Sequence, residues 1–136
     1  MFFGKHIDGH CPILSGKELN AVASVGIRNC HETTDEVGFR EKLKRGVMVL
    51  LREGSLCKDV SHLAHLITEF NSAYIAFCTD DRNPLEIMKE GHIDHIIRRA
   101  IELGAPVHAA YRCASWSAAR GFGLNDRGLI APNYLA

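Results

Sequence analysis

The stretch VMVLLR, residues 47–52, is apolar at five successive positions, and AYIAFCT, residues 73–79, repeats this character at six. Near-continuous apolar runs of this length are typical of strands that are buried on both faces of a parallel sheet. Residues 2–8 and 26–30 are predicted as two earlier strands. Segments with helical spacing separate the four predicted strands, as the crossovers of a parallel sheet require. The order β-α-β-α-β-α-β therefore predicts a parallel α/β fold.

Three helices are predicted between these strands. Ser15, followed three residues later by Glu18, forms a capping-box pattern at the start of the first helix. Asp35 is a candidate cap for a second helix that runs to Lys44. An apolar stripe predicts the third helix; it consists of Leu63, Leu66, Ile67 and Phe70.

The C-terminal third of the chain is predicted to be helical. Pro84 suits the first turn of a short helix. A second helix is expected over residues 92–103, before Gly104, and a third over residues 106–122, ending at Gly123. The last residues, DRGLIAPNYLA, are expected to form an extended tail. Residues 1–136 are interpreted as a single domain.

Composition narrows the classes of partner. The chain has 136 residues and a mass of 15.1 kDa, and its 16 basic residues balance 16 acidic ones. No excess of positive charge favours binding to nucleic acid or to an anionic membrane. The apolar runs are far shorter than the roughly 20 residues that span a bilayer, and no leader-peptide pattern is present. We therefore expect a soluble, cytoplasmic chain whose partner is a small molecule or another protein.

The five cysteines are scattered and include no C-x-x-C pair. This spacing argues against a zinc ribbon, a thioredoxin-type motif and a disulfide framework. It also excludes the P-C-x-x-C signature of the cytidine-type zinc deaminases. We expect reduced, mostly buried thiols. Cys11 and Cys30 are of interest because each adjoins a candidate site histidine.

Polar residues follow every predicted strand. His10 follows the first strand, His31 the second, the sequence REGS (52–55) the third, and TDDR (79–82) the fourth. The carboxyl ends of parallel strands meet at one edge, so His10, His31 and Asp80 are expected to converge. Two imidazoles and a carboxylate suit Zn, Fe or Mn. Each residue taken singly is more often a surface or core residue, and both interpretations remain open at this point.

The remaining histidines are weaker candidates. His92 and His95 are neighbours on a predicted helix and could hold a metal, but an exposed turn near the site mouth is favoured. A structural role is preferred for His62, His65 and His108.

Four segments resemble one known family. They are DGHCPILSGKELNAVASVGIRNCHET (8–33), REGS, CTDDRNPLEIMKEGHIDHIIRRAIELG (78–104) and the C-terminal DRGLIAPNYLA. Together they resemble the bacterial adenine deaminases of the amidohydrolase superfamily. The resemblance covers nearly the whole chain but only part of the family's length. It implies a TIM-type (β/α)8 barrel of which this chain would supply strands five to eight and the closing helices, a half-barrel.

The resemblance also implies roles for five residues. His10 matches the fifth-strand metal ligand, His31 the sixth-strand ligand and Asp80 the eighth-strand aspartate. His31 and Asp80 would be catalytic, with Asp80 acting as general base and then as acid. Asp81 and Arg82 would hydrogen-bond the purine edge. His6 and Asp8 are expected deeper in the first strand, as supporting residues.

The implied reaction is the hydrolytic deamination of adenine to hypoxanthine and ammonia, a purine-salvage step, with water activated by a divalent metal such as manganese, iron or zinc. The family's H-x-H pair and bridging acidic residue are absent, and Asn133 replaces a familiar glycine. The chain is therefore expected to be a fragment with weak or no activity alone. An isolated half-barrel would leave open strand edges. We therefore expect a homo-oligomer, or docking onto a missing half-barrel. The alternative is a non-catalytic half-barrel that binds a purine or a protein partner.

Overall fold

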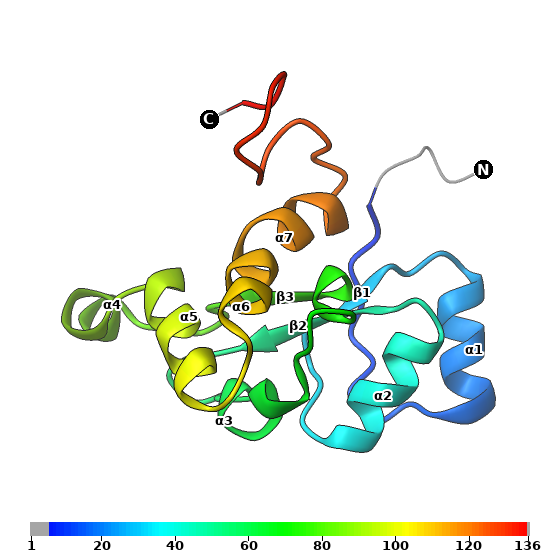
Figure 1. The fold of residues 1–136 in the computed structure, drawn as a ribbon. Coiled ribbons are helices and arrows are strands. Elements are labelled where there is room, and N and C mark those ends of the chain that lie inside the picture. Colours follow the sequence, from blue (N-terminus) through cyan, green and yellow to red (C-terminus); the bar gives the residue numbers. More distant parts are fainter. Residues whose placement is uncertain (1–5, 136) are drawn as a thin grey trace.

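The computed structural model describes residues 6–135 and contains a three-stranded parallel sheet (Figure 1). The strands are β1 (Asn29–Cys30), β2 (Met48–Arg52) and β3 (Ile75–Cys78), and they lie side by side in chain order. Asn29 pairs with Met48, and Val49 pairs with Ile75. The predicted parallel α/β arrangement is confirmed. Three strands do not establish a half-barrel, which stays a prediction.

The predicted first strand is not found where the structure describes it. Residues 2–5 lie outside the described residues, and residues 6–8 form no strand. The chain nevertheless runs beside the start of β1, because the Arg28 amide donates to the Ile7 carbonyl at 3.0 Å. The Gly9 amide likewise donates to the Asn29 side chain at 3.2 Å. A Cβ at Gly9 would lie 2.6 Å from the Asn29 carbonyl oxygen, so this close approach requires glycine.

The helices follow the predicted order with two corrections. The predicted helix over residues 106–122 is broken at Ser115, whose hydroxyl donates back to the Tyr111 carbonyl at 2.7 Å. Such back-bonding competes with the helix ladder and bends helices. The helices are α1 (Gly16–Ser24), α2 (Glu36–Lys44), α3 (Val60–Leu63), α4 (Pro84–Glu90), α5 (Ile93–Glu102), α6 (Val107–Ala114) and α7 (Trp116–Gly121), with short 3-10 turns η1 (Ala64–Leu66) and η2 (Ser72–Tyr74).

The second correction concerns the predicted stripe that ends at Phe70. Leu63, Leu66 and Ile67 are buried as expected, but the Phe70 side chain is 94% exposed. The Asn71 side chain accepts from the Thr68 amide at 2.7 Å, and the Asn71 amide donates to the Thr68 hydroxyl at 3.2 Å. These local bonds replace the helix ladder, so the helix ends before Phe70.

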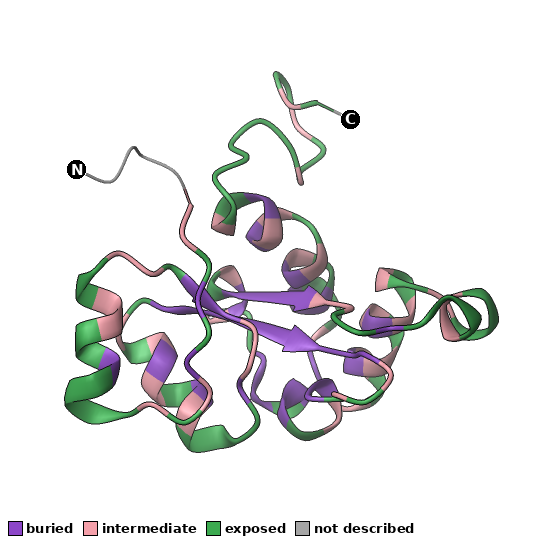
Figure 2. Ribbon diagram, turned by 180° about the vertical axis from the view of Figure 1, so that it is seen from behind, coloured by how far each residue is buried: buried purple, intermediate pink, exposed green. Residues whose placement is uncertain are grey.

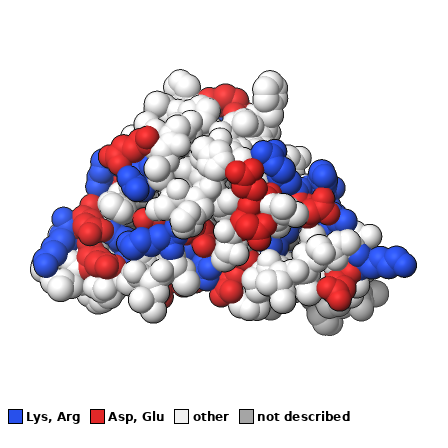
Figure 3. Space-filling model, turned by 90° about the horizontal axis from the view of Figure 1, so that it is seen from below, with Lys and Arg blue, Asp and Glu red and all other residues white. Residues whose placement is uncertain are grey.

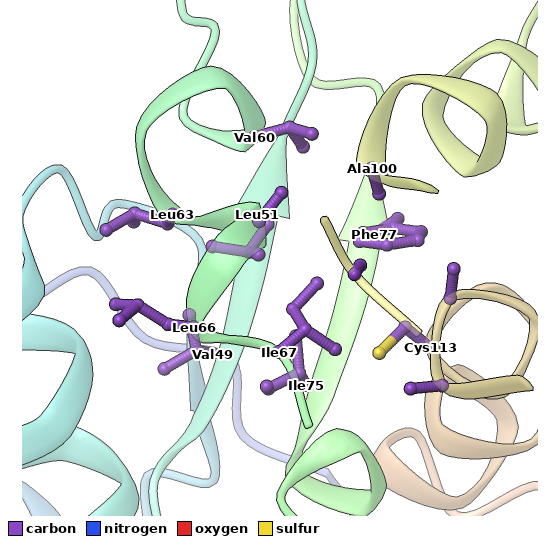
Figure 4. Packing of buried hydrophobic residues seen from close by; sticks show 14 of the residues in the cluster. Val49, Leu51, Val60, Leu63, Leu66, Ile67, Ile75, Phe77, Ala100 and Cys113 are labelled. Carbon is purple, nitrogen blue, oxygen red and sulfur yellow. The ribbon is translucent and has the colours of Figure 1, made fainter. Parts of the chain in front are cut away.

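The main core lies between the sheet and the helices (Figure 4). Side chains alternate along β2 and β3, and one set, including Leu51 and Phe77, meets residues of the helices such as Ala100 and Cys113. The other face carries Met48, Leu50 and Ala76, against which Ala118 of α7 packs. Helices α2 and α3 contact β2, whereas α5, α6 and α7 contact β3.

Burial is uneven across the molecule (Figure 2). The strands are almost entirely buried, whereas the C-terminal tail is mostly exposed and contains no helix or strand up to residue 135. The expectation of an extended tail was wrong: the tail turns back, and the Leu135 amide donates to the Asp126 carbonyl at 2.6 Å. Helix α4 has no buried residue and stands at the end of the molecule opposite α1 and α2 (Figure 1). Its attachment to the rest of the chain is therefore polar.

Surface charge is mixed. On the face shown in Figure 3, acidic and basic side chains lie among one another, and neither sign covers a continuous area. This agrees with the balanced composition. None of the helices within residues 6–135 combines the length and the apolar character needed to span a bilayer.

The two predicted helix caps differ, which provides a matched pair of variants. The Asp35 carboxylate accepts from the Gly38 amide at 2.8 Å, whereas Ser15 makes no side-chain capping bond. Asp35→Ala is expected to lower the free energy of unfolding by about 1 kcal/mol, the usual loss for an N-cap. Ser15→Ala should change the free energy of unfolding by only a few tenths of a kcal/mol. Urea denaturation of both variants measures the difference, and equal losses would contradict this view of the two caps.

Candidate metal centre

Two of the predicted ligands, His10 and His31, lie together. His10 is on the segment that runs beside β1, and His31 follows β1 directly. Their ring centroids are 5.6 Å apart. The His10 side chain is 60% exposed and the His31 side chain is 29% exposed, so both are reachable from solvent. The sequence-based expectation that these two histidines meet is confirmed.

A third side chain, Glu32, completes a cluster with them. One donor atom from each of His10, His31 and Glu32 lies within 4.8 Å of the other two. The Glu32 Oε1 atom is 3.6 Å from His10 Nδ1. Sequence reasoning did not select Glu32, although its place directly after His31, in the same strand-end segment, was the available signal. Imidazole nitrogen and carboxylate oxygen are donors that Zn, Fe and Mn accept, so these residues fit a divalent metal.

A buried arginine, Arg52, stands behind Glu32. Its side chain is 5% exposed; Nη1 is 3.1 Å from Glu32 Oε1, and Nε donates to Asp59 Oδ2 at 2.6 Å. Burial lowers the pKa of the Arg52 guanidinium, but the hydrogen bond and charge of Asp59, with smaller effects of Cys57 and Glu32, raise it further than burial lowers it. Arg52 is therefore a permanent cation between two carboxylates.

Acidic groups predominate around this cluster. Asp8 Oδ2 is 3.7 Å from His31 Nδ1. The supporting role expected for Asp8 stays a prediction. Burial, followed by the charge of Asp80, raises the pKa of the Cys78 thiol to about 12; Asp59 and Asp8 raise it further and Arg52 opposes them. These acidic groups favour a cation over an anion at this edge of the sheet.

Asp80 does not join the cluster. Within residues 6–135 the only grouping of metal-ligating side chains is His10, His31 and Glu32. Asp80 follows β3 and has a φ of 47°, which places it in the left-handed region that non-glycine residues seldom adopt. The predicted ligand and catalytic roles of Asp80 stay predictions.

Asp81 holds the loop that follows β2. Its carboxylate accepts from the Ser55 amide at 3.0 Å and from the Leu56 amide at 3.2 Å. A Cβ at Gly54 would overlap the Asp81 carboxylate, so this arrangement depends on glycine at position 54. The Ser55 hydroxyl also bonds Glu86 of α4 and accepts from the Asn83 amide.

Arg82 is enclosed by protein groups, with none of its side chain exposed. It donates to the Gly91 carbonyl at 3.1 Å, to the Glu53 carbonyl at 3.4 Å and to the Glu90 carboxylate at 2.6 Å. These bonds join the end of β2 to the end of α4. The predicted purine contacts of Asp81 and Arg82 stay predictions. Nor do His92 and His95 join a metal-ligating group in the described part of the chain.

Glu53 is a buried carboxyl group that the predicted site does not use. Burial raises its pKa above the ordinary 4.5, although Lys58, Arg99 and Arg82 pull it down, and its Oε2 atom has no hydrogen-bond partner among the described residues. The Glu53 carboxyl group therefore holds its proton more tightly in the folded chain than in the unfolded chain. The resulting stability is fully present below pH 4.5 and is lost as pH rises through the folded pKa.

The free energy of unfolding of Glu53→Gln should accordingly fall less than that of the wild type as pH rises above 4.5. Urea denaturation at a series of pH values measures this slope. Glu18→Gln, at an exposed position, serves as the control and should keep the wild-type slope. Identical slopes for Glu53→Gln and the wild type would contradict the burial argument.

Comparison with known proteins places these residues in context. No family model matches the chain. It is 59% identical over 131 residues to the adenine deaminase of Methylobacterium nodulans and 58% identical over 131 residues to that of Cereibacter sphaeroides. These matches cover 96% of this chain and 23% of each relative. Adenine deaminase 1 of Rhizobium etli is 54% identical over 135 residues, 99% of this chain and 24% of the relative.

The chain thus spans about a quarter of the length of the curated relatives it matches. At this identity, nearly all of it is homologous to one segment of proteins named adenine deaminase. The resemblance noted in the sequence is confirmed.

Proposed function

We propose, from this homology to adenine deaminases, that the chain supplies part of a metal-dependent site that hydrolyses adenine to hypoxanthine and ammonia. The supporting observation is the meeting of His10 and His31, which come from separate segments and present donors to one point. The proposal also places the chain in the cytoplasm, with adenine as the substrate of the complete site.

The proposed roles follow the chemistry of each side chain. His10 and His31 hold a divalent metal, Mn, Fe or Zn, and Asp80 is a further ligand. When bound, the metal supplies a water molecule acidified for attack on the ring carbon that carries the amino group. An Asp80 carboxylate oxygen accepts a proton from that water and passes it to the amine nitrogen. The carbon–nitrogen bond breaks, a carbon–oxygen bond replaces it, and ammonia leaves.

Asp81 is proposed to hydrogen-bond the purine edge, and Arg82, for which the same contact was expected, is proposed to support it indirectly. Asp81 is bound to the Ser55 and Leu56 amides, so a direct contact would require the loop to release its carboxylate. Arg82, which has no exposed side chain, would act by holding the same loop in place. The loop after β2 is thus the proposed wall of the purine site.

The test is turnover with added Mn²⁺, Fe²⁺ or Zn²⁺, first by the purified chain, which we expect to have weak or no activity alone, and then by the chain mixed with the remaining part of an adenine deaminase barrel. Hypoxanthine and ammonia should form in equal amounts, and His31→Ala should abolish both. His62→Ala is the matched control, because His62 is exposed and outside the cluster, and it should retain the activity. Adenine binding without turnover under every metal would favour the alternative, a non-catalytic module that binds a purine.

Light scattering at micromolar concentration tests the proposed assembly. We expect a homo-oligomer, or a complex when the remaining part of an adenine deaminase barrel is added, since open strand edges favour pairing. A chain that stays monomeric in both measurements would contradict this part of the proposal.

A further inference from the structure

We propose that Glu32 is the third protein donor to a divalent cation held by His10 and His31, and that Arg52 is the positioning residue that aims Glu32 at it. The presence of a metal is taken from the proposed function, but the inference concerns how the metal is bound and not the reaction. Its first support is distance: donor atoms of the three residues lie within 4.8 Å of one another. A modest movement of exposed or partly exposed side chains would bring all three to one ion.

Glu32 is fixed at its backbone before any ligand binds. Its amide donates to the Cys30 Sγ atom at 3.4 Å, and the Cys30 thiol donates to the Glu32 carbonyl at 3.6 Å. Cys30 is completely buried at the end of β1. The residue that follows His31 is therefore anchored to the sheet, and less ordering entropy is lost when it binds an ion.

Arg52 fixes the side chain of Glu32 without neutralising the cluster. Its contact with Asp59 is 2.6 Å and its contact with Glu32 is 3.1 Å, so one guanidinium faces two carboxylates. The group of three carries a net negative charge, which a divalent cation can balance. Arg52 and His10 both approach Oε1 of Glu32, at 3.1 Å and 3.6 Å, so the carboxylate lies between the buried cation and the histidine pair.

The same ion pair separates the role of Glu32 from that of a general base. Glu32 Oε1 already contacts the Arg52 guanidinium at 3.1 Å, so the proposal assigns this carboxylate to holding a cation and not to moving a proton. Proton transfer remains with Asp80 in the proposed function. Glu32 and Asp80 therefore make different, separable contributions.

The experiment is a Co²⁺ titration of the full chain, because the visible absorption of bound cobalt reports the number and kind of its ligands. Glu32→Gln should weaken binding by about tenfold or more and change the spectrum. Glu36→Gln, an exposed carboxylate outside the cluster, is the control and should match the wild type. Wild-type affinity and spectrum in Glu32→Gln would overturn the assignment.

Arg52→Lys tests the positioning role. It keeps the positive charge but loses the fork that contacts both carboxylates. We expect folded Arg52→Lys to bind cobalt with an altered spectrum; an unchanged spectrum would mean that Arg52 is only structural. If either variant fails to fold, Glu32→Asp, which keeps the charge and shortens the reach, should still bind more weakly than the wild type, and equal binding would overturn the assignment of Glu32.

The two proposals fail in distinguishable ways. A chain that binds cobalt through Glu32 but releases no ammonia even when mixed with the remaining part of an adenine deaminase barrel would contradict the proposed function and support this inference. A chain that deaminates adenine while Glu32→Gln keeps wild-type cobalt binding would contradict the inference alone.

Discussion

Replacing Arg52 by methionine is expected to lower the free energy of unfolding by about 3–5 kcal/mol, the loss typical of breaking a buried ion pair. The Arg52 side chain is 5% exposed and that of Asp59 is 7% exposed. The variant would leave the Asp59 carboxylate buried without its partner at 2.6 Å and would also release Glu32. Urea denaturation at neutral pH, followed by circular dichroism, measures the loss.

A surface ion pair provides the control for this prediction. Arg98 Nη1 is 2.8 Å from Asp94 Oδ2, with both side chains more than half exposed. Arg98→Met should therefore cost no more than about 1 kcal/mol. Adding Asp59→Asn to Arg52→Met should recover part of the loss, since the unpaired charge is then removed. A loss below that of Arg98→Met would show that water reaches Asp59 and that the pair is not buried in solution.

Phe77→Ala is expected to destabilise the fold by about 3–5 kcal/mol, because it removes a large side chain and leaves a cavity. Phe77 lies on β3 and points into the core with Leu51, Ala100 and Cys113 (Figure 4). Its relative exposure is 5%. Thermal and urea unfolding measure the loss.

Phe70→Ala is the matched control, since it removes the same atoms from a side chain that is 94% exposed. It should change the stability by no more than about 0.5 kcal/mol. Equal losses in the two variants would mean that Phe70 is covered in solution, for instance by a second chain. Comparing the two variants at several protein concentrations would show whether a second chain covers Phe70, because the loss would then depend on concentration.

The strands that could be predicted are those whose own residues form an apolar run. Residues 47–52 and 73–79 are apolar because both faces of β2 and β3 are covered, so composition alone indicates their burial. Residues 6–8 mix polar and apolar side chains and contact β1 through a few bonds, which no local pattern encodes. The break at Ser115 was likewise invisible, because it depends on a hydroxyl that bonds the previous turn.

The meeting of His10 and His31 could be predicted from the topology of a parallel sheet. His10 and His31 meet because neighbouring segments of a parallel sheet end at the same edge, and this follows from chain order. Glu32 was missed because its direction depends on Arg52 and Cys30, which come from different strands. The burial of Arg82 could not be foreseen for a similar reason, since its partners lie before and after it in the chain.

Helix α4 has a consequence for how this surface can change over time. It contributes nothing to the core. Its side chains are attached to the rest of the molecule by two contacts, Ser55 with Glu86 and Arg82 with Glu90, and the Asn83 side chain caps it by accepting from the Glu86 amide. Substitutions at its outward positions, such as Leu85 and Met88, therefore carry little penalty in folding. Exchange of those side chains therefore leaves the core intact, so the outer face of α4 is a surface whose chemistry can change at little cost to the fold.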